Sequence, residues 1–359
     1  MRFVMFYHSL VSDWNHGNAH FLRGVANELI RRGNHVRIYE PDNGWSYRNL
    51  VSQHGDQPLR DFEDVYPELR SLKYNSDFLD LDQALDGADV VMVHEWNPSQ
   101  FIAKLGQHRK HSRYRLYFHD THHRCVTSPD SMGLEFLRDY DGVLTFGESL
   151  RRLYEEKDCN SRVWVWHEAA DTHVFQPLER IAKCGDLVWI GNWGDEERTR
   201  ELRDFLFAPV QQLELSARVY GVRYPAHALA ELAKSAIPYS GWTANFRVPQ
   251  IFAGFDMTVH IPRRPYREGL PGVPTIRVFE ALACGIPLVC APWDDSEHLF
   301  EPGKDYLVAQ DTAEMTSMLK ELKTNPALRA DLSAHGLATI QARHTCRHRV
   351  DQLLEIVEQ

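Results

Sequence analysis

The chain has 359 residues, of which 43% are apolar, 25% charged and 11% aromatic. This length and composition predict about two domains, each with its own hydrophobic core, and exclude disorder as the dominant state. The chain has 40 Lys and Arg residues and 50 Asp and Glu residues, which gives a net charge of −10. This acidic balance argues against binding to duplex nucleic acid.

The sequence carries no sign of export or membrane insertion. Its six cysteines form no CxxC pair, so free thiols in a reducing compartment are the simplest interpretation. No stretch approaches the roughly 20 apolar residues that a membrane-spanning helix needs, and the amino terminus lacks a secretory pattern. We therefore expect a cytoplasmic protein without a transmembrane segment.

The first half of the chain alternates strand-like apolar runs with helix-like stretches. Residues 2–7 predict a buried strand, the spacing over 21–30 predicts a helix ending at Gly33, and 35–39 predict a second strand. The expected elements that continue this alternation are strands at 90–93, 115–118, 143–146 and 163–166 and helices at 100–105 and 149–157. The aperiodic stretch after them ends at Pro177, where we place the domain boundary.

A second alternation begins near Asp186. Its expected elements are strands at 187–190, 217–220, 255–259 and 287–290, helices at 196–206 and 276–283, a loop over 262–274, and helices over the last 48 residues. Strands that alternate with helices imply parallel sheets, so the fold class is α/β with two doubly wound domains, 1–177 and 178–344.

Polar, glycine-containing stretches follow the predicted strands in both halves. Open α/β sheets bind ligands beyond the carboxyl ends of their strands, so we expect a ligand cleft between the two domains. The stretches that would line it are 8–18, 94–98, 119–124, 191–194, 239–242 and 262–277.

Several common enzyme motifs are absent from the sequence. The chain has no GxGxxG after its first strand, no Walker A sequence, no HExxH and no GxSxG. A dinucleotide cofactor is therefore not expected.

One segment carries a resemblance to a known family. TIRVFEALACGIPLVCAPWDDSEHLFEPGKDYLVA, residues 275–309, resembles the nucleotide-sugar half of GT-B glycosyltransferases, and looks most like the spore-protein CgeB-like branch. That branch also resembles this chain in YFHDTHHR (117–124), VWIGNWGDE (188–196) and HTCRHR (344–349).

The resemblance implies two Rossmann-like domains facing a central cleft, with the final helix, 345–359, packing back on the first domain. It implies transfer of a sugar from a nucleoside diphosphate sugar, with UDP favoured, to the hydroxyl of an unidentified acceptor. No bound metal or other cofactor is expected.

By this resemblance, Glu280 binds the ribose of the donor. One carboxylate can accept hydrogen bonds from two adjacent hydroxyls, although a solvated glutamate in a first helical turn is the alternative. The main-chain amides at Thr275, Ile276 and Arg277 open a helix and would bind phosphate, with the Arg277 side chain adding charge. Better-known retaining families carry a second glutamate eight residues before the first, where this chain has Gly272.

Two further turns are expected to bind the donor. A GxxG turn after a strand lets amides approach a diphosphate, and aromatic side chains after a later strand could stack on the base. A tight connection and ordinary core packing are the alternatives. The residues concerned are Gly191, Asn192, Trp193, Tyr239, Gly241 and Trp242.

The first half should supply the acceptor site and a general base. We predict His119 or Asp120 in HDTHHR as the base of an inverting displacement, or His119 as a contact to the donor sugar in a retaining one. A zinc site and a structural hydrogen-bond network are the alternatives. Further candidates for the acceptor side of the cleft are Gly17, Asn18, Asp13, His94 and Glu95. A helix cap is the alternative for the Gly17-Asn18 pair.

Two other functions remain compatible with the sequence. One is a nucleotide-sugar 2-epimerase on the same fold. The other is a non-catalytic nucleotide-sugar-binding protein, because the second glutamate of the retaining pattern is missing.

Overall fold

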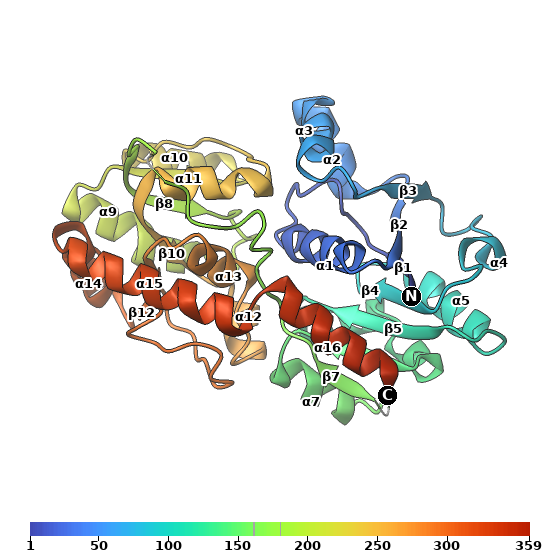
Figure 1. Ribbon diagram of the computed structural model, residues 1–359. Coiled ribbons are helices and arrows are strands. Elements are labelled where there is room, and N and C mark those ends of the chain that lie inside the picture. Colours follow the sequence, from blue (N-terminus) through green and yellow to red (C-terminus); the bar gives the residue numbers. More distant parts are fainter. Residues whose placement is uncertain (161, 180) are drawn as a thin grey trace. The chain divides into compact units, whose positions relative to one another are not determined.

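The chain divides into two compact units in the computed structural model, which describes residues 1–160, 162–179 and 181–359. Unit 1 comprises residues 1–168 and 346–359, and unit 2 comprises 169–345 (Figure 1). Each unit is built on its own parallel sheet, so the two predicted α/β domains are confirmed. The chain passes from unit 1 to unit 2 after Glu168, nine residues before the expected boundary at Pro177.

The sheet of unit 1 has seven strands in the order β3-β2-β1-β4-β5-β6-β7, all paired in parallel. Its central strands are continuous apolar runs because helices cover both faces. The strands are β1 Arg2–Phe6, β2 His35–Pro41, β3 Ser71–Tyr74, β4 Val90–His94, β5 Arg115–Asp120, β6 Gly142–Thr145 and β7 Val163–Val165.

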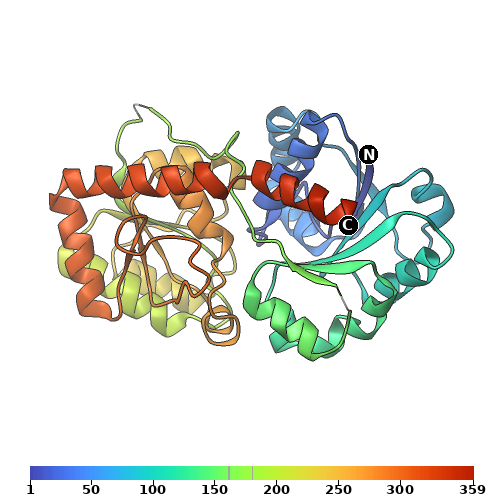
Figure 2. The same ribbon diagram turned by 60° about the horizontal axis from the view of Figure 1, so that its bottom comes forward.

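The helices of unit 1 include the expected ones and several that the sequence did not indicate. The α-helices are α1 Ala19–Arg31, α2 Trp45–His54, α3 Gln57–Val65, α4 Leu81–Ala84, α5 Ser99–Arg109, α6 Arg124–Thr127, α7 Glu148–Glu156 and α16 Cys346–Glu358, with 3₁₀ turns η1 Pro129–Ser131 and η2 Leu134–Asp139. The last helix of the chain, α16, packs on the first, α1 (Figure 2). An ion pair of 2.6 Å between Arg32 and Asp351 joins the two.

Unit 2 has five parallel strands in the order β12-β11-β10-β8-β9. The strands are β8 Gly185–Ile190, β9 Ala217–Tyr220, β10 Phe255–His260, β11 Leu288–Cys290 and β12 Leu307–Val308. Its helical segments are α8 Thr199–Leu202, a π-helical turn η3 Arg203–Phe207, α9 Ala208–Leu213, α10 Ala226–Lys234, η4 Asn245–Arg247, α11 Val248–Ala253, α12 Arg264–Gly269, α13 Ile276–Ala283, α14 Thr312–Thr324 and α15 Pro326–Arg343.

The loop predicted over 262–274 is partly wrong, because it contains the short helix α12. Pro265 lies in the first turn of this helix, where an amide hydrogen has no partner within the helix and its loss costs nothing. A proline therefore marks the start of an element here and not a break.

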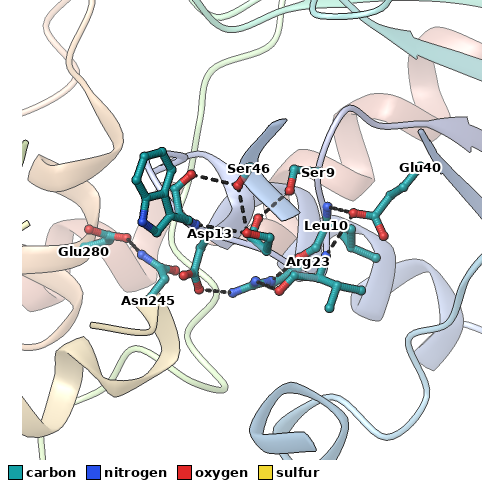
Figure 3. A network of polar contacts seen from close by, with 11 residues as sticks. Ser9, Leu10, Asp13, Arg23, Glu40, Ser46, Asn245 and Glu280 are labelled. Carbon is teal, nitrogen blue, oxygen red and sulfur yellow. Dashed lines mark hydrogen bonds and ion pairs between the residues drawn. The ribbon is translucent and has the colours of Figure 1, made fainter. Parts of the chain in front are cut away.

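The loop between β1 and α1 is held by a buried arginine. The Arg23 side chain of α1 is wholly buried and forms an ion pair of 3.0 Å with Asp13 (Figure 3). Its Nε donates to the Leu10 carbonyl at 2.7 Å, and its Nη2 donates to the Val11 carbonyl at 2.9 Å. One guanidinium thus fixes three points of the loop.

A carboxylate from the neighbouring strand holds the same loop from the other side. Glu40 of β2 accepts hydrogen bonds from the Leu10 amide at 2.5 Å and the Val11 amide at 3.2 Å. The Ser46 hydroxyl of α2 donates to the Trp14 carbonyl at 2.7 Å. The loop is therefore preformed, and so are the polar side chains that it carries.

Among the described residues, no helix is both long and apolar enough to span a bilayer.

Replacing Arg23 by Met tests how much this arginine contributes to folding. The change leaves Asp13 buried without its cation, and we expect it to lower the free energy of unfolding by about 3–5 kcal/mol. Urea denaturation measures the effect. Arg32→Met, which removes a more exposed arginine just after the same helix, should cost about 1 kcal/mol or less. Equal losses in the two variants would contradict this account.

Candidate functional site

The carboxyl edge of the unit 1 sheet gathers histidines around one buried carboxyl group. His94, at the end of β4, lies 2.5 Å from Glu95 Oε2 through its Nδ1. The same Nδ1 lies 3.3 Å from Nδ1 of His8, and the rings of His8 and His16 lie 4.1 Å apart. We call His8, His16, His94 and Glu95 the histidine cluster.

Burial keeps the groups of this cluster uncharged. It lowers the pKa of His94 to about 3, helped by the nearby charge of Arg124, and raises the pKa of Glu95 well above its usual range. His94 and Glu95 therefore lie side by side as two neutral groups. Burial also lowers the pKa of His8, as does its proximity to His94.

Exposure singles out one member of the cluster. His94 and Glu95 are wholly buried and His16 nearly so, whereas His8 is half-buried. His8 is therefore the imidazole that a ligand can reach, and its lowered pKa leaves the ring unprotonated at neutral pH. The sequence signal for His8 was its place as the first polar residue after the first strand, which we did not use.

The two residues predicted as the base lie inside the unit. Asp120 is wholly buried, with Oδ2 accepting from the Tyr154 hydroxyl at 2.8 Å and Oδ1 from the His122 amide at 3.0 Å. Burial raises its pKa, and the proximity of the Glu95 carboxyl group raises it further. Asp120 thus anchors the chain after β5 and does not reach a substrate.

His119 is a core residue. Its ring packs 4.8 Å from Trp166 and 6.0 Å from Phe21, and neither ring nitrogen has a hydrogen-bond partner among the described residues. Burial lowers its pKa well below the usual range. A general base must contact the acceptor hydroxyl, so this geometry argues against the predicted roles of both His119 and Asp120.

The other candidates of unit 1 have structural partners. Asp13 is held by Arg23, as described above. Asn18 precedes α1 without capping it through its side chain, and instead donates to Thr121 Oγ1 at 2.7 Å. Gly17 lies beside it in the same loop. Asn18 therefore ties the loop after β1 to the loop after β5.

The alternative of a zinc site finds no ligand set. In the part of the chain that the structure describes, no three or more His, Cys, Asp or Glu side chains are placed to hold a metal ion. The adjacent His122 and His123 stack on each other with ring centroids 4.0 Å apart.

In unit 2, one arginine organises the turn at residues 191–194. Arg198 is nearly buried, and its Nη2 donates to both the carbonyl and the side-chain oxygen of Asn192 at 2.6 Å. Its Nη1 donates to the Ile261 carbonyl at 2.9 Å. The turn is packed so closely that a Cβ on Gly221 would clash with the Gly191 carbonyl. The sequence analysis did not single out Arg198.

Arg198 has no carboxylate partner among the described residues. Burial lowers its pKa to about 9, and the positive charges of Arg263 and Arg277 lower it too. Arg263 is paired with Glu197 at 3.1 Å, and Arg277 forms an ion pair with Glu280. The surroundings of Arg198 are therefore short of negative charge.

The helix α13 begins where the sequence predicts. Thr275 is its N-cap residue, and His260 Nε2 lies 2.9 Å from Thr275 Oγ1. Glu280 is wholly buried, and its Oε1 accepts from Asn245 Nδ2 at 2.7 Å (Figure 3). The alternative of a solvated glutamate in the first turn is therefore wrong.

Position 272, where retaining families carry the second glutamate, is occupied by glycine, and the local backbone favours this residue. Its φ of +87° is one that side chains rarely adopt, and an added Cβ would clash with Ser296 Oγ. Glu268, twelve residues before Glu280, is exposed on α12 and paired with Arg267 at 2.9 Å. A second carboxylate cannot occupy the position of Gly272 in this backbone.

The aromatic residues predicted to bind the donor differ in exposure. Trp193 lies in the hydrophobic core, with its indole nitrogen donating to Glu196 at 3.1 Å. Tyr239 is 38% exposed, and its hydroxyl donates to the Gly221 carbonyl at 2.8 Å. Trp242 is half-buried, and Gly241 between them has a φ of +70°. The side chains of Tyr239 and Trp242 can reach a ligand, whereas that of Trp193 cannot.

Solved structures share this pair of sheets. A sucrose-phosphate synthase from Thermosynechococcus elongatus superposes with a TM-score of 0.68 at 13% identity, over 100% of this chain and 98% of that chain. HepE from Anabaena, solved with UDP and glucose, has a TM-score of 0.67 at 14% identity, over 100% and 99%. BGT of phage T4, solved with UDP and Mn²⁺, has a TM-score of 0.63 at 14% identity, over 100% of both chains.

The fold is that of the GT-B glycosyltransferases. Residues 198–355, just under half of the chain, match a family model described as glycosyl transferase-like. The predicted glycosyltransferase class is thus confirmed at the level of the fold and of this match. A search of curated protein sequences found no match to this chain.

A His119→Leu variant tests the assignment of His119 to the core. The unfolded chain protonates this imidazole below pH 6.5 and the folded chain does not, so stability falls as the pH drops below 6.5. Without His119, the loss of unfolding free energy between pH 6.5 and 5 should shrink by about 1.4 kcal/mol per pH unit. Urea denaturation across this range measures it. An unchanged slope, or lower stability at pH 8, would contradict the assignment.

Proposed function

We propose that the protein transfers a sugar from a nucleoside diphosphate sugar to an acceptor hydroxyl, and that unit 2 holds the donor. The observation that carries this proposal is the buried guanidinium of Arg198, which has no carboxylate partner among the described residues. A buried charge without a counterion is costly, so its presence favours an anionic ligand.

A diphosphate matches this environment in charge and in hydrogen bonding. Arg198, Arg263 and Arg277 would offset its negative charge, and the amides of Thr275, Ile276 and Arg277 at the start of α13 would donate to its oxygens. The turn Gly191–Gly194, held by Arg198, would add further amides. We propose that these groups suffice without a metal ion.

The remaining donor contacts are proposed from the family resemblance for Glu280, which is wholly buried, and from exposure for Tyr239 and Trp242. The buried Glu280 carboxylate, oriented by Asn245, would accept hydrogen bonds from the ribose, and Tyr239 and Trp242 would contact the base. We favour UDP because HepE and BGT, which share the fold, were solved with it. We also propose, from the motifs quoted above, that the chain is related to the CgeB-like branch of the glycosyltransferases.

Unit 1 would supply the base. The acceptor oxygen forms a bond to the anomeric carbon, its proton passes to His8 Nε2, and the bond from that carbon to the diphosphate breaks. The electron pair of the broken bond leaves with the diphosphate. His94 contacts Nδ1 of His8, and Glu95 in turn contacts His94, so we take both as positioning residues.

The alternatives make different predictions for the same protein. A 2-epimerase converts the donor without an acceptor, and a binding protein takes up the nucleotide without turnover. The proton acceptor in unit 1 favours the transferase, because neither a binding protein nor an acceptor-free reaction needs to deprotonate an acceptor hydroxyl.

Replacing Arg198 by Met tests the donor site. The change leaves the Asn192 and Ile261 carbonyls without their donor but no carboxylate without its cation, so we expect a lower melting temperature with the fold retained, while affinity for UDP falls by about tenfold or more. Isothermal titration calorimetry with UDP measures the affinity, and the melting temperature checks the fold. Arg200→Met, at an exposed position on α8 two residues after Arg198, is the matched control and should bind UDP normally. Equal affinity in both variants would refute the donor site.

A His8→Gln variant tests the base. We expect the rate of sugar transfer to fall by about a hundredfold or more, with UDP affinity unchanged, because only proton removal is lost. In the wild type, kcat/KM should stay level from pH 8 to 6.5 and fall only at lower pH, since the pKa of His8 lies below 6.5. His111→Gln, an exposed histidine after α5, is the control. Full activity in the His8 variant would remove it from the mechanism.

A further inference from the structure

An exposed tryptophan, Trp96, lies beside the histidine cluster and has no role in the proposed reaction. Trp96 follows β4 and Glu95 in the chain, and 42% of its surface is exposed. Its ring lies 5.8 Å from the ring of His8 and 5.0 Å from that of His122. Trp96 is one of the large apolar side chains that the structure shows as exposed, and its ring lies beside that of the proposed base.

An arginine fixes the orientation of this indole. The guanidinium carbon of Arg124 lies 4.5 Å from the Trp96 ring centroid. Arg124 is itself held, because its Nη1 donates to the Glu95 carbonyl at 2.7 Å and its Nη2 donates to Ser131 Oγ at 3.0 Å. A rigid aromatic surface is therefore presented next to His8, where it loses little conformational freedom when a ligand binds.

The surroundings of the indole indicate what it can hold. The groups in contact with it are two imidazoles and a guanidinium, which are polar and form hydrogen bonds. An aromatic acceptor would need apolar walls on more than one side. A sugar ring differs, because one of its faces is formed by C–H groups and its rim carries hydroxyls.

We propose that Trp96 stacks against a sugar ring of the acceptor, so that the acceptor hydroxyl reaching His8 belongs to a saccharide. The apolar face of that ring lies on the indole, and its hydroxyls bond to His122 and Arg124. This inference rests on the proposed function, since it takes His8 as the base.

Saturation-transfer difference NMR tests the binding without knowledge of the donor sugar. The full chain, saturated with UDP, is mixed with a panel of methyl glycosides of glucose, galactose, mannose and N-acetylglucosamine, with cellobiose and maltotriose, and separately with 4-nitrophenol. We expect at least one saccharide to give a signal that is strongest at the C–H protons of one ring face. In Trp96→Ala its apparent affinity should fall about three- to tenfold, the scale of an aromatic contact, whereas Trp96→Phe should keep most of it.

The control is Trp45→Ala, which removes another exposed tryptophan of unit 1, on α2, and should leave the saccharide signal unchanged. The inference is overturned if no saccharide gives a signal, if Trp96→Ala binds as the wild type does, or if 4-nitrophenol binds through Trp96 and the saccharides do not. UDP affinity, measured on the same samples, separates the two proposals. Its absence in the wild type refutes the donor site, and its presence without saccharide binding refutes the acceptor class alone.

Discussion

A guanidinium removed from water needs oxygen acceptors and, if it stays charged, a negative partner, and this constraint acts differently in the two units. In unit 1, Arg23 finds the Asp13 carboxylate and two main-chain carbonyls, so its charge is neutralised within the protein. In unit 2, Arg198 finds main-chain and amide oxygens but no carboxylate among the described residues. The first arginine is therefore structural, and the second leaves charge for a ligand to balance.

The histidine cluster differs from these two arginines, because its buried groups are uncharged. His94 and Glu95 are buried side by side as neutral groups, and the half-buried His8 stays unprotonated next to His94. The braced loop after β1 sets the position of His8, through Arg23 on one side and Glu40 on the other. The folding of unit 1 thus fixes the position of the imidazole that we propose as the proton acceptor.

Much of the fold could be predicted from the sequence, because buried parallel strands are continuous apolar runs that punctuate the chain. The elements between 45 and 74 were missed for a physical reason. The strand β3 lies at the edge of the sheet and is largely exposed, so it has no apolar run to detect. The helix α12 was hidden by a proline that starts it.

The site was predicted less completely than the fold. The start of α13 could be expected from a motif in which the chain order fixes the local geometry, whereas the complete burial of Glu280 was not predicted. The sequence does not show how deeply a side chain at the end of a strand is buried. His119 and Asp120 were therefore taken as accessible, although both lie in the interior. The roles proposed for His8 and Arg198 depend on contacts with residues far along the chain, which no local sequence pattern shows.

The central claim is that unit 2 binds a nucleoside diphosphate by its arginines and main-chain amides. A thermal-shift measurement with UDP, GDP, dTDP, CMP and ADP, each with and without EDTA, tests it most directly. We predict that UDP raises the melting temperature by the same amount in both conditions. A shift that EDTA abolishes would contradict metal-independent binding, and the absence of any shift would contradict the donor site itself.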